Sequence, residues 1–336
     1  MAPTIRDVAR VAGVSQATVS RALSMPEVVR AATRVRVEVA ARELGYRPNR
    51  AARGLITGRT GNLGLIVPDL SNPFFAAVVK GVQAAARSAD HSVFIADTDE
   101  EVGVEADLLR ALAKQVDGLI LCSPRAPDDE LAGVGSDTTV VLMNRMAGER
   151  PSVTVDNADG MRQALEHLAA LGHRRVAFVA GPRTSWSNAQ RENGLRRTAE
   201  AGGVDLAHLG HFPPQFEGGV AAADLAAASG ATAVIAYNDL VALGLLSRLG
   251  ARGIPVPAAM SVVGCDDIGM SAMSHPALTT VSVPKRAAGR ATVGLLLSLL
   301  DAGVDAGPMH RELPTQLIVR GTTGVAPISS TKGSSR

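Results

Sequence analysis

The chain has 336 residues, of which 46% are hydrophobic and 20% charged, an ordinary composition for a soluble protein with room for one small domain and one or two larger ones. No apolar run reaches membrane-spanning length, and no cationic start with an apolar core indicates export, so we expect a cytoplasmic protein. The two cysteines, Cys122 and Cys265, each stand in an apolar run typical of a buried strand and indicate neither a disulfide framework nor a zinc site.

The charge is unevenly distributed along the chain. Residues 1–60 contain eleven arginines, no lysine and four acidic residues, a net charge of +7, whereas the whole chain carries +2. The remaining 276 residues therefore carry −5, the difference between +2 and +7. A basic segment at one end of a mildly acidic protein is the charge pattern expected when that segment contacts phosphates.

The first residues predict two helices joined by a tight turn. Thr4 is a suitable N-cap, and the apolar residues after it recur at helical spacing, namely Ile5, Val8, Ala9 and Ala12. Gly13 ends this helix, Ser15 caps the next, and Val19 and Leu23 face inward. The side chains expected on the exposed face of this second helix are small or hydrogen-bonding, namely those of Gln16, Ala17, Thr18, Ser20 and Arg21. Such side chains suit a helix N-terminus against base edges in a major groove, although any two-helix scaffold is the alternative.

A third helix at 31–44, with Val35, Val39 and Ala40 inward, favours the DNA-binding interpretation. It is followed by G-Y-R-P-N at 45–49, a helix-stop signal. The sequence therefore predicts a three-helix, helix-turn-helix head over 1–47, with a connecting segment at 48–60.

From residue 61, short β-branched runs alternate with amphipathic helices, which predicts an α/β fold of parallel sheets flanked by helices. Strands are expected at 63–67, 93–96, 118–122 and 140–143, and the pattern restarts after 153–156 with strands at 176–180, 234–237 and 262–264. The repeated pattern predicts two similar lobes with a cleft between them. Ligands of such sheets bind beyond the carboxyl ends of strands. Polar residues stand at those ends, as Asp69, Asn72, Asn144, Arg145, Asn238, Asp239, Asp266 and Asp267.

Ordered motifs over residues 3–323 closely resemble the LacI/GalR family of bacterial transcription regulators. They include T-I-R-D-V-A at 4–9, T-V-S-R-A-L at 18–23, Y-R-P-N at 46–49, N-P-F-F at 72–75, L-G-H-R-R-V-A-F-V-A-G at 171–181, N-D at 238–239 and V-V-G-C-D-D at 262–267. The resemblance implies a periplasmic-binding-protein-like body over 61–323, a homodimer, and operator binding switched by a small effector. Its lobes are expected at about 61–155 with 284–312 and 156–283 with 313–323, and residues 324–336 at the end are expected to form a disordered tail.

The resemblance also implies the DNA contacts. Base choice falls to Gln16, Ala17 and Arg21, whereas Thr4, Arg6, Thr18, Ser20 and Asn49 suit phosphates, with Ser15 and Arg53 as further DNA-binding residues. The segment after Y-R-P-N matches a hinge helix that orders on DNA and inserts Leu55 into the minor groove. Packing of Leu55 within the linker is the alternative, and Gly54 weakens so short a helix by up to ~1 kcal/mol.

The positions that match the family's effector pocket are Asn72, Phe74, Phe75, Arg145, Arg191, Asn238 and Asp266. The single tryptophan, Trp186, joins them as a flat apolar face for a sugar ring, and Arg191 follows a cap expected at Ser187. Core packing is the alternative for Phe75, and either Phe212 or Phe216 lines the far lobe. The effector is expected to be a sugar or sugar derivative that releases DNA, with a co-repressor as the alternative.

Two other function classes fit the sequence less well. The phosphate-loop, dinucleotide and nucleophile-elbow signatures of enzymes are absent, and no cofactor or metal is expected. His208 and His211 are expected in an exposed loop, not in a metal site. A periplasmic sugar-binding protein would carry a signal peptide where the basic head stands. A tetramer is disfavoured because no leucine heptad follows residue 323.

Overall fold

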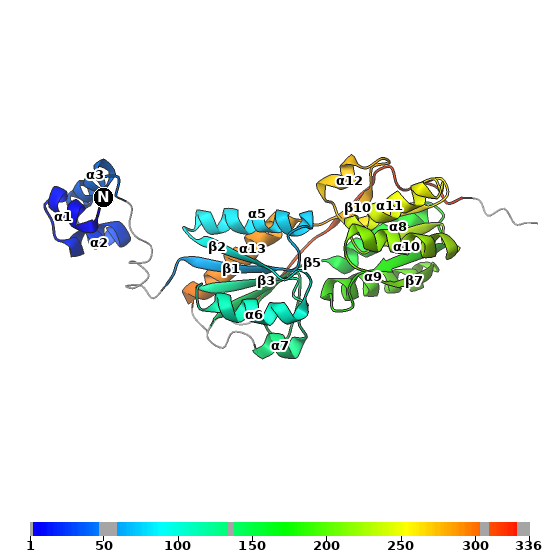
Figure 1. Cartoon of the computed structure of the whole chain (residues 1–336), viewed down its shortest axis with the longest axis horizontal. Helices are drawn as coiled ribbons and strands as arrows, with labels where there is room; N and C mark the ends of the chain where they lie inside the picture. Colours follow the sequence, from blue (N-terminus) through cyan, green and yellow to red (C-terminus); the bar gives the residue numbers. More distant parts are fainter. Residues whose placement is uncertain (1–2, 47–58, 134–137, 303–308, 328–336) are drawn as a thin grey trace, which may run out of the picture. The chain divides into compact units, whose positions relative to one another are not determined.

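The computed structural model describes residues 3–46, 59–133, 138–302 and 309–327. The chain divides into two compact units, residues 1–61 and 62–336. The first is the helical head, and the second holds two α/β lobes (Figure 1).

The head consists of α1 (Ile5–Ala12), α2 (Gln16–Ser24), the short 3₁₀ helix η1 (Pro26–Val28) and α3 (Ala31–Glu43). Asp7 fixes the start of α1 by accepting from the Thr4 backbone N–H at 2.9 Å and from its hydroxyl at 2.7 Å. Gly13 takes the left-handed conformation that ends α1, with φ +63°, and Ser15 then caps α2 by accepting from the Thr18 N–H at 3.1 Å. The predicted helix–turn–helix is confirmed at both caps.

The three helices bury one small core, made of Val8, Ala9, Ala12, Val19, Ala22, Val37, Ala40 and Ala41. The expected inward face of the third helix was partly wrong, because Val35 and Val39 are exposed and Val37 is buried in their place. The three valines alternate in sequence, and a helix cannot turn all of them to one side.

Lobe 1 is a six-stranded parallel sheet in the order β11-β5-β4-β3-β1-β2. Its strands are β1 (Asn62–Val67), β2 (Ser92–Asp97), β3 (Gly118–Cys122), β4 (Thr139–Met143), β5 (Ser152–Val155) and β11 (His310–Leu313). The helices α5 (Pro73–Ser88) and α13 (Lys285–Ala302) cover one face, and α6 (Val102–Ala113) and α7 (Asp128–Gly133) the other (Figure 1). The central strands are buried on both faces, as their uninterrupted apolar runs predicted.

Lobe 2 repeats this design in the order β12-β10-β9-β8-β6-β7, with β12 antiparallel to its neighbour. Its strands are β6 (Arg175–Ala180), β7 (Asp205–His211), β8 (Ala233–Ala236), β9 (Ser261–Asp266), β10 (Thr279–Ser282) and β12 (Gln316–Ile318). The helices α8 (Asn157–Ala170) and α9 (Trp186–Gly202) pack together, as do α10 (Phe216–Ala228) and α11 (Asp239–Ala251), and α12 (Gly269–Met273) follows β9.

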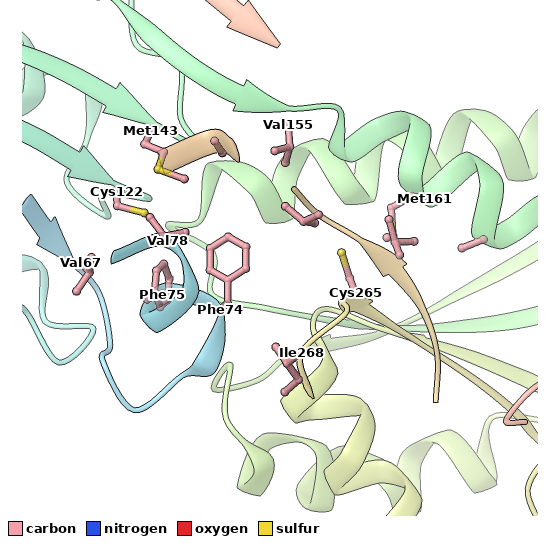
Figure 2. Packing of buried hydrophobic residues seen from close by; sticks show 14 of the residues in the cluster. Val67, Phe74, Phe75, Val78, Cys122, Met143, Val155, Met161, Cys265 and Ile268 are labelled. Atoms are coloured by element: carbon pink, nitrogen blue, oxygen red, sulfur yellow. The ribbon is translucent and has the colours of Figure 1, made fainter. Parts of the chain in front are cut away.

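The described chain passes between the lobes after β5, after β10 and after β11. One hydrophobic cluster runs from lobe 1 into lobe 2 beside these crossings and includes Phe74, Met143, Val155, Met161 and Cys265 (Figure 2). The three strands before these crossings end at Val155, Ser282 and Leu313.

Two expectations about loops were wrong. Residues 324–327, placed in a disordered tail, lie against lobe 2, where the Gly324 N–H donates to Ser261 Oγ at 3.1 Å and the Ala326 N–H to the Leu171 carbonyl at 2.9 Å. The remainder of that tail, 328–336, lies outside the described residues. His208 and His211 belong to β7 and not to a loop, because this edge strand pairs with β6 through Phe178↔His208 and Ala180↔His211.

Candidate functional site: the cleft between the lobes and the DNA-facing helix

A pocket lies where the carboxyl ends of strands from both lobes meet. Its lining residues are Asn72, Phe74, Phe75, Glu100, Ser123, Arg125, Asn144, Ser187, Arg191, Pro214, Tyr237, Asn238 and Asp266. The cavity left between them is about 20 Å³, room for a single water molecule. Six of the eight residues predicted as ligand-binding are therefore brought together.

Local capping explains the position of two of these residues. Asn72 caps α5 by accepting from the Phe74 N–H at 2.9 Å, which turns Phe74 and Phe75 toward the cleft. Their rings meet edge to face with centroids 5.0 Å apart, and both are 5% exposed. Asn238 caps α11 and donates to the Pro214 carbonyl at 2.7 Å. The caps thus fix both walls of the pocket.

The other two predicted residues are not among those that line the pocket. Arg145 is buried behind the wall of lobe 1, where it donates to the Pro124 carbonyl at 3.0 Å and to Asp128 at 2.6 Å. Trp186 is half-buried at the first position of α9. The cap of this helix is Ser185 and not Ser187, so that Ser187, and not Trp186, borders the cleft.

Neither phenylalanine considered for the far lobe lines the pocket. Phe212 packs against the hydrophobic cluster beneath α10 and α11, and Phe216 is 39% exposed at the start of α10. Pro214, which stands between them in the sequence, takes the lining position.

Arg191 organises the wall of lobe 2. It is 3% exposed, its Nε donates to Asn157 Oδ1 at 2.9 Å, and its Nη2 lies 3.5 Å from Asp266 Oδ1. Its guanidinium also donates to the Tyr237 carbonyl and lies over the Tyr237 ring, 4.9 Å from the centroid. Burial raises the pKa of Asp266 to about 7, although Arg191 acts in the opposite direction.

A second acid–arginine pair stands on the wall of lobe 1. Arg125 donates from Nε to Glu100 Oε2 at 2.7 Å and from Nη2 to Glu100 Oε1 at 2.9 Å. The Arg125 side chain is 3% exposed and that of Glu100 is 17% exposed. The Arg125 backbone N–H donates to Glu105 at 2.8 Å, which fixes the loop after β3. Sequence reasoning missed this pair because its members are 25 residues apart in two different loops.

Backbone strain is concentrated in the same place. Four lining residues other than glycine have positive φ, namely Glu100 at +61°, Ser123 at +48°, Asn144 at +56° and Asp266 at +118°. Such conformations are held against strain of order 1–3 kcal/mol each and gather at functional sites. The strain at these four residues supports the cleft as the ligand site.

The head presents a polar face on α2. Ser15, Gln16, Ala17 and Arg21 are exposed, as are Thr4 and Arg6 at the start of α1, whereas Thr18 and Ser20 are half-buried. The side chain of Thr18 is 2.9 Å from Ser15 Oγ, so it completes the cap of the helix. Asn49, Arg53 and Leu55 lie outside the described residues, and their predicted DNA contacts stay predictions.

Comparison with known proteins agrees with both parts of this architecture. Residues 4–49 match the bacterial regulatory proteins of the lacI family, and residues 165–323 match a periplasmic binding protein-like domain. The chain is 34% identical over 334 residues to the HTH-type transcriptional repressor CytR of Escherichia coli K12, covering 97% of this chain and 98% of that protein. The chain belongs to the lacI family. It is therefore a DNA-binding transcriptional regulator.

Solved structures of lacI-family proteins share the whole fold. A Lac repressor dimer bound to operator and the anti-inducer ONPF superposes with a TM-score of 0.83 at 29% identity, covering 96% of this chain and all of that one. The transcriptional regulator CelR in complex with cellobiose gives a TM-score of 0.71 at 33% identity, covering 95% and 99%.

Several polar residues of this lacI-family chain near the cleft are structural. Asp239 is fully buried and accepts from the Ile268 N–H at 2.9 Å, Ser271 Oγ at 2.6 Å and Thr280 Oγ1 at 2.5 Å, which ties α11 to α12 and β10. Asp69 accepts from Ser71 within a turn. Burial raises the pKa of Cys122 and of Cys265 to about 12, so both thiols are unreactive.

Within the ranges that the structure describes, no cluster of three metal-ligating side chains occurs and no helix is long and apolar enough to cross a membrane.

Proposed function

We propose that the protein is a repressor that binds a near-palindromic operator as a homodimer in the cytoplasm and is released by a sugar or sugar derivative in the cleft. The observation that carries this proposal is the capped α2, which exposes Gln16, Ala17 and Arg21 on one side of a packed three-helix core. The Lac repressor dimer bound to operator and the CelR complex with cellobiose support it by family relation.

The proposed base and phosphate contacts follow from the chemistry of these side chains. Arg21 has the donors to hold guanine O6 and N7 together, and Ala17 offers a methyl group to a thymine. A twofold-symmetric dimer would place two such helices on the two halves of an operator. Thr4 and Arg6 are proposed as phosphate contacts, and Leu55 is proposed as a minor-groove wedge between the half-sites.

The effector is proposed to act by changing the angle between the lobes. The cleft residues belong to both sheets, so a molecule held between them favours one lobe arrangement over another. The coupling is limited by the ligand's difference in affinity for the two arrangements. We propose that this regulator works without catalysis and without a resident cofactor, and that it associates with the nucleoid through its operators.

The direct test is to incubate the purified full-length protein with sheared DNA from its own genome at a stated salt concentration, and to sequence the retained fragments. Enrichment of one near-palindromic site supports the proposal, and the neighbouring genes then indicate which saccharide to test for release. Enrichment that requires an added small molecule would support a co-repressor in place of an inducer. Retention without any shared site would contradict specific binding.

A further inference from the structure

Lobe 1 has a groove of about 740 Å³ between α13 and the edge strand β11, and this groove shares no lining residue with the cleft. A volume of this size accommodates several side chains, so part of another molecule fits there. Small and apolar residues line most of this α13–β11 groove, namely Ala287, Ala291, Gly294, Leu295, Met309 and Leu313.

The α13 side of the groove is an uncovered helix face. The α13 residues that line the groove recur every three or four positions from Ala287 to Ser298, so they share one face. Outside the backbone of α13, no described atom lies within 4 Å of the Cβ position of Gly294 on this face. On another face, a Cβ at Gly289 would stand 2.7 Å from the Val78 carbonyl oxygen of α5. One side of α13 is therefore packed on α5, and the side toward the groove is open.

The strand β11 offers an open sheet edge to the same groove. It is the last strand in the order of its sheet and pairs there only with β5. The Leu313 carbonyl accepts from the Asp156 N–H at 2.9 Å, on the β5 side. Because backbone groups alternate in direction along a strand, those of His310 and Glu312 point away from β5. These groups can pair with an added strand.

Two side chains of β11 anchor this edge to β5. The His310 ring lies 3.0 Å from Ser152 Oγ through Nδ1 and 3.3 Å from Thr154 Oγ1 through Nε2. Thr154 Oγ1 also donates to Glu312 Oε1 at 3.4 Å, and both hydroxyl residues of β5 are buried. Arg311 stands between the two anchoring residues in sequence, so its side chain points to the opposite face of the sheet. The open edge is therefore held in a fixed position.

The groove is positively charged. Arg290 and Arg311 line it and are exposed, and neither guanidinium forms an ion pair or a hydrogen bond with another residue that the structure describes. The described lining includes no acidic residue, although residues 61–336 carry a net charge of −5. Carboxylates on a partner would complement these two arginines.

The same features decide between possible occupants. A second copy docked groove to groove would bring four guanidinium groups together without an acid between them. A nucleic acid would satisfy the arginines with phosphates but leave Leu295, Met309 and the open strand edge without partners. An extended peptide with acidic and apolar side chains matches the charge, the apolar lining and the strand edge together.

We propose that the α13–β11 groove is a docking site for an extended acidic segment of a partner protein. The segment adds a strand to β11, places carboxylates at Arg290 and Arg311, and lays apolar side chains along α13. The site is separate from the cleft and from the DNA-facing helix, so it provides the regulator with a second input.

The first experiment selects peptides from a random decapeptide library on the immobilised full-length protein, free of DNA. The selected peptides are expected to contain at least two acidic residues interspersed with apolar ones. Arg290→Glu and Arg311→Glu are each expected to weaken binding of the consensus peptide by about 5-fold or more, because each places like charges in contact. Arg286→Glu makes the same charge change at an exposed α13 position outside the groove lining and is expected to have less than a 2-fold effect.

Three results of this selection would overturn the proposal. They are a basic or uncharged consensus, an equal loss of affinity in Arg286→Glu, and the absence of any selected peptide. The last is the result expected if residues 303–308 of the chain itself cover the groove. A duplex of random sequence is expected to bind the wild-type protein and Arg290→Glu equally, and weaker binding by the variant would assign the groove to nucleic acid.

The second experiment tests strand addition and the helix face separately. A saturating amount of the consensus peptide is expected to slow hydrogen exchange several-fold at the amides of His310 and Glu312, and N-methylation of alternate peptide residues in one register is expected to abolish binding. Gly294→Gln extends a side chain into the groove and is expected to weaken the peptide more than Gly294→Ala, while both gain helix propensity. Unchanged exchange at both amides, or equal affinities of the two Gly294 variants, would overturn the docking geometry. Neither an operator nor an effector enters these measurements, so their failure is distinct from failure of the proposed function.

Discussion

Arg191 Nε donates to Asn157 Oδ1 at 2.9 Å, which connects the wall of the pocket to the first residue of α8 after the chain crosses into lobe 2. The Asn157 amide nitrogen in turn donates to the Val155 carbonyl at 3.1 Å and lies 3.5 Å from Asn144 Oδ1. A ligand that displaces Arg191 is therefore expected to displace Asn157 and, with it, the segment that crosses between the lobes. Buried hydrogen bonds of this kind have defined geometry and can transmit a small displacement.

Asn157→Ala is expected to weaken the effect of the effector on DNA more than it weakens effector binding. The substitution removes the side chain that joins Arg191 to the crossing, and typical allosteric couplings amount to ~1–3 kcal/mol. Operator affinity is measured by titration with and without a saturating saccharide that binds the wild-type protein. The ratio of the two affinities is expected to fall several-fold in the variant. An unchanged ratio would mean that coupling bypasses Asn157.

Arg21→Ala is expected to relax base preference at one position in each half of the operator, at ~1–3 kcal/mol per bidentate contact. The exposed position of Arg21 on α2 is the structural reason. Arg42→Ala removes an equal charge from the exposed side of α3 and serves as the matched control. Selection from a randomised operator library measures both. The prediction does not hold if both variants lose affinity equally for all sequences.

Leu55→Ala is expected to weaken operator binding while leaving saccharide affinity unchanged, because a minor-groove wedge acts only on the bent DNA. The measurement compares operator titration with saccharide titration on the same preparation. Wild-type operator affinity would remove the wedge assignment, which rests on family resemblance alone.

The regular elements of the body could be predicted because their strands are buried on both faces. Runs such as Leu63–Val67 and Gly118–Cys122 are continuous in sequence for the same reason that they are central in the sheet. The third helix was harder, since Val35, Val37 and Val39 alternate and only tertiary packing decides which of them faces inward. Residues 324–327 carry no periodic pattern, and backbone hydrogen bonds to lobe 2 order them.

Two of the predicted cleft residues also cap a helix, which gives them a signal of their own in the sequence. Asn72 and Asn238 can be recognised in the sequence, because each follows a strand and caps the start of a helix. Glu100 and Arg125 resemble solvated loop charges in sequence, and only the juxtaposition of two loops at one sheet edge buries them together. Tyr237 follows an apolar strand directly, so nothing in the sequence indicates the hydrogen bond between its hydroxyl and Ser185 Oγ.

Asp266→Asn is expected to stabilise the protein at pH 8 and to stabilise it by less at pH 5. The folded-state pKa of about 7 lies above the ordinary value of 3.8. The stability that this carboxyl contributes is therefore fully present below pH 3.8 and is lost as the pH rises through 7, where the buried group ionises. Thermal unfolding at both pH values measures the difference. A gain of ~1 kcal/mol would raise Tm by ~2–4 °C in a domain of this size.

The same carboxyl gives effector binding a proton signature. A hydroxyl that donates to Asp266 favours its ionised form and lowers its pKa, so saccharide binding at pH 6.5 is expected to release protons. Calorimetry in two buffers of different ionisation enthalpy measures this release, and Asp266→Asn is expected to abolish it. Proton uptake in the wild-type protein would mean that the effector prefers the neutral acid.

Gly244→Ala is expected to destabilise lobe 2, whereas Gly250→Ala on the same helix is expected to stabilise it. A Cβ at Gly244 would stand 2.0 Å from the Phe216 carbonyl oxygen, because α10 and α11 approach each other with almost no space between their backbones. Overpacking of this kind typically costs ~1–3 kcal/mol. Gly250 is exposed with nothing within 4 Å of its Cβ position, so alanine there gains helix propensity of up to ~1 kcal/mol. Chemical denaturation of the two variants measures both signs, and equal destabilisation would show that the close approach at Gly244 is not what limits the substitution.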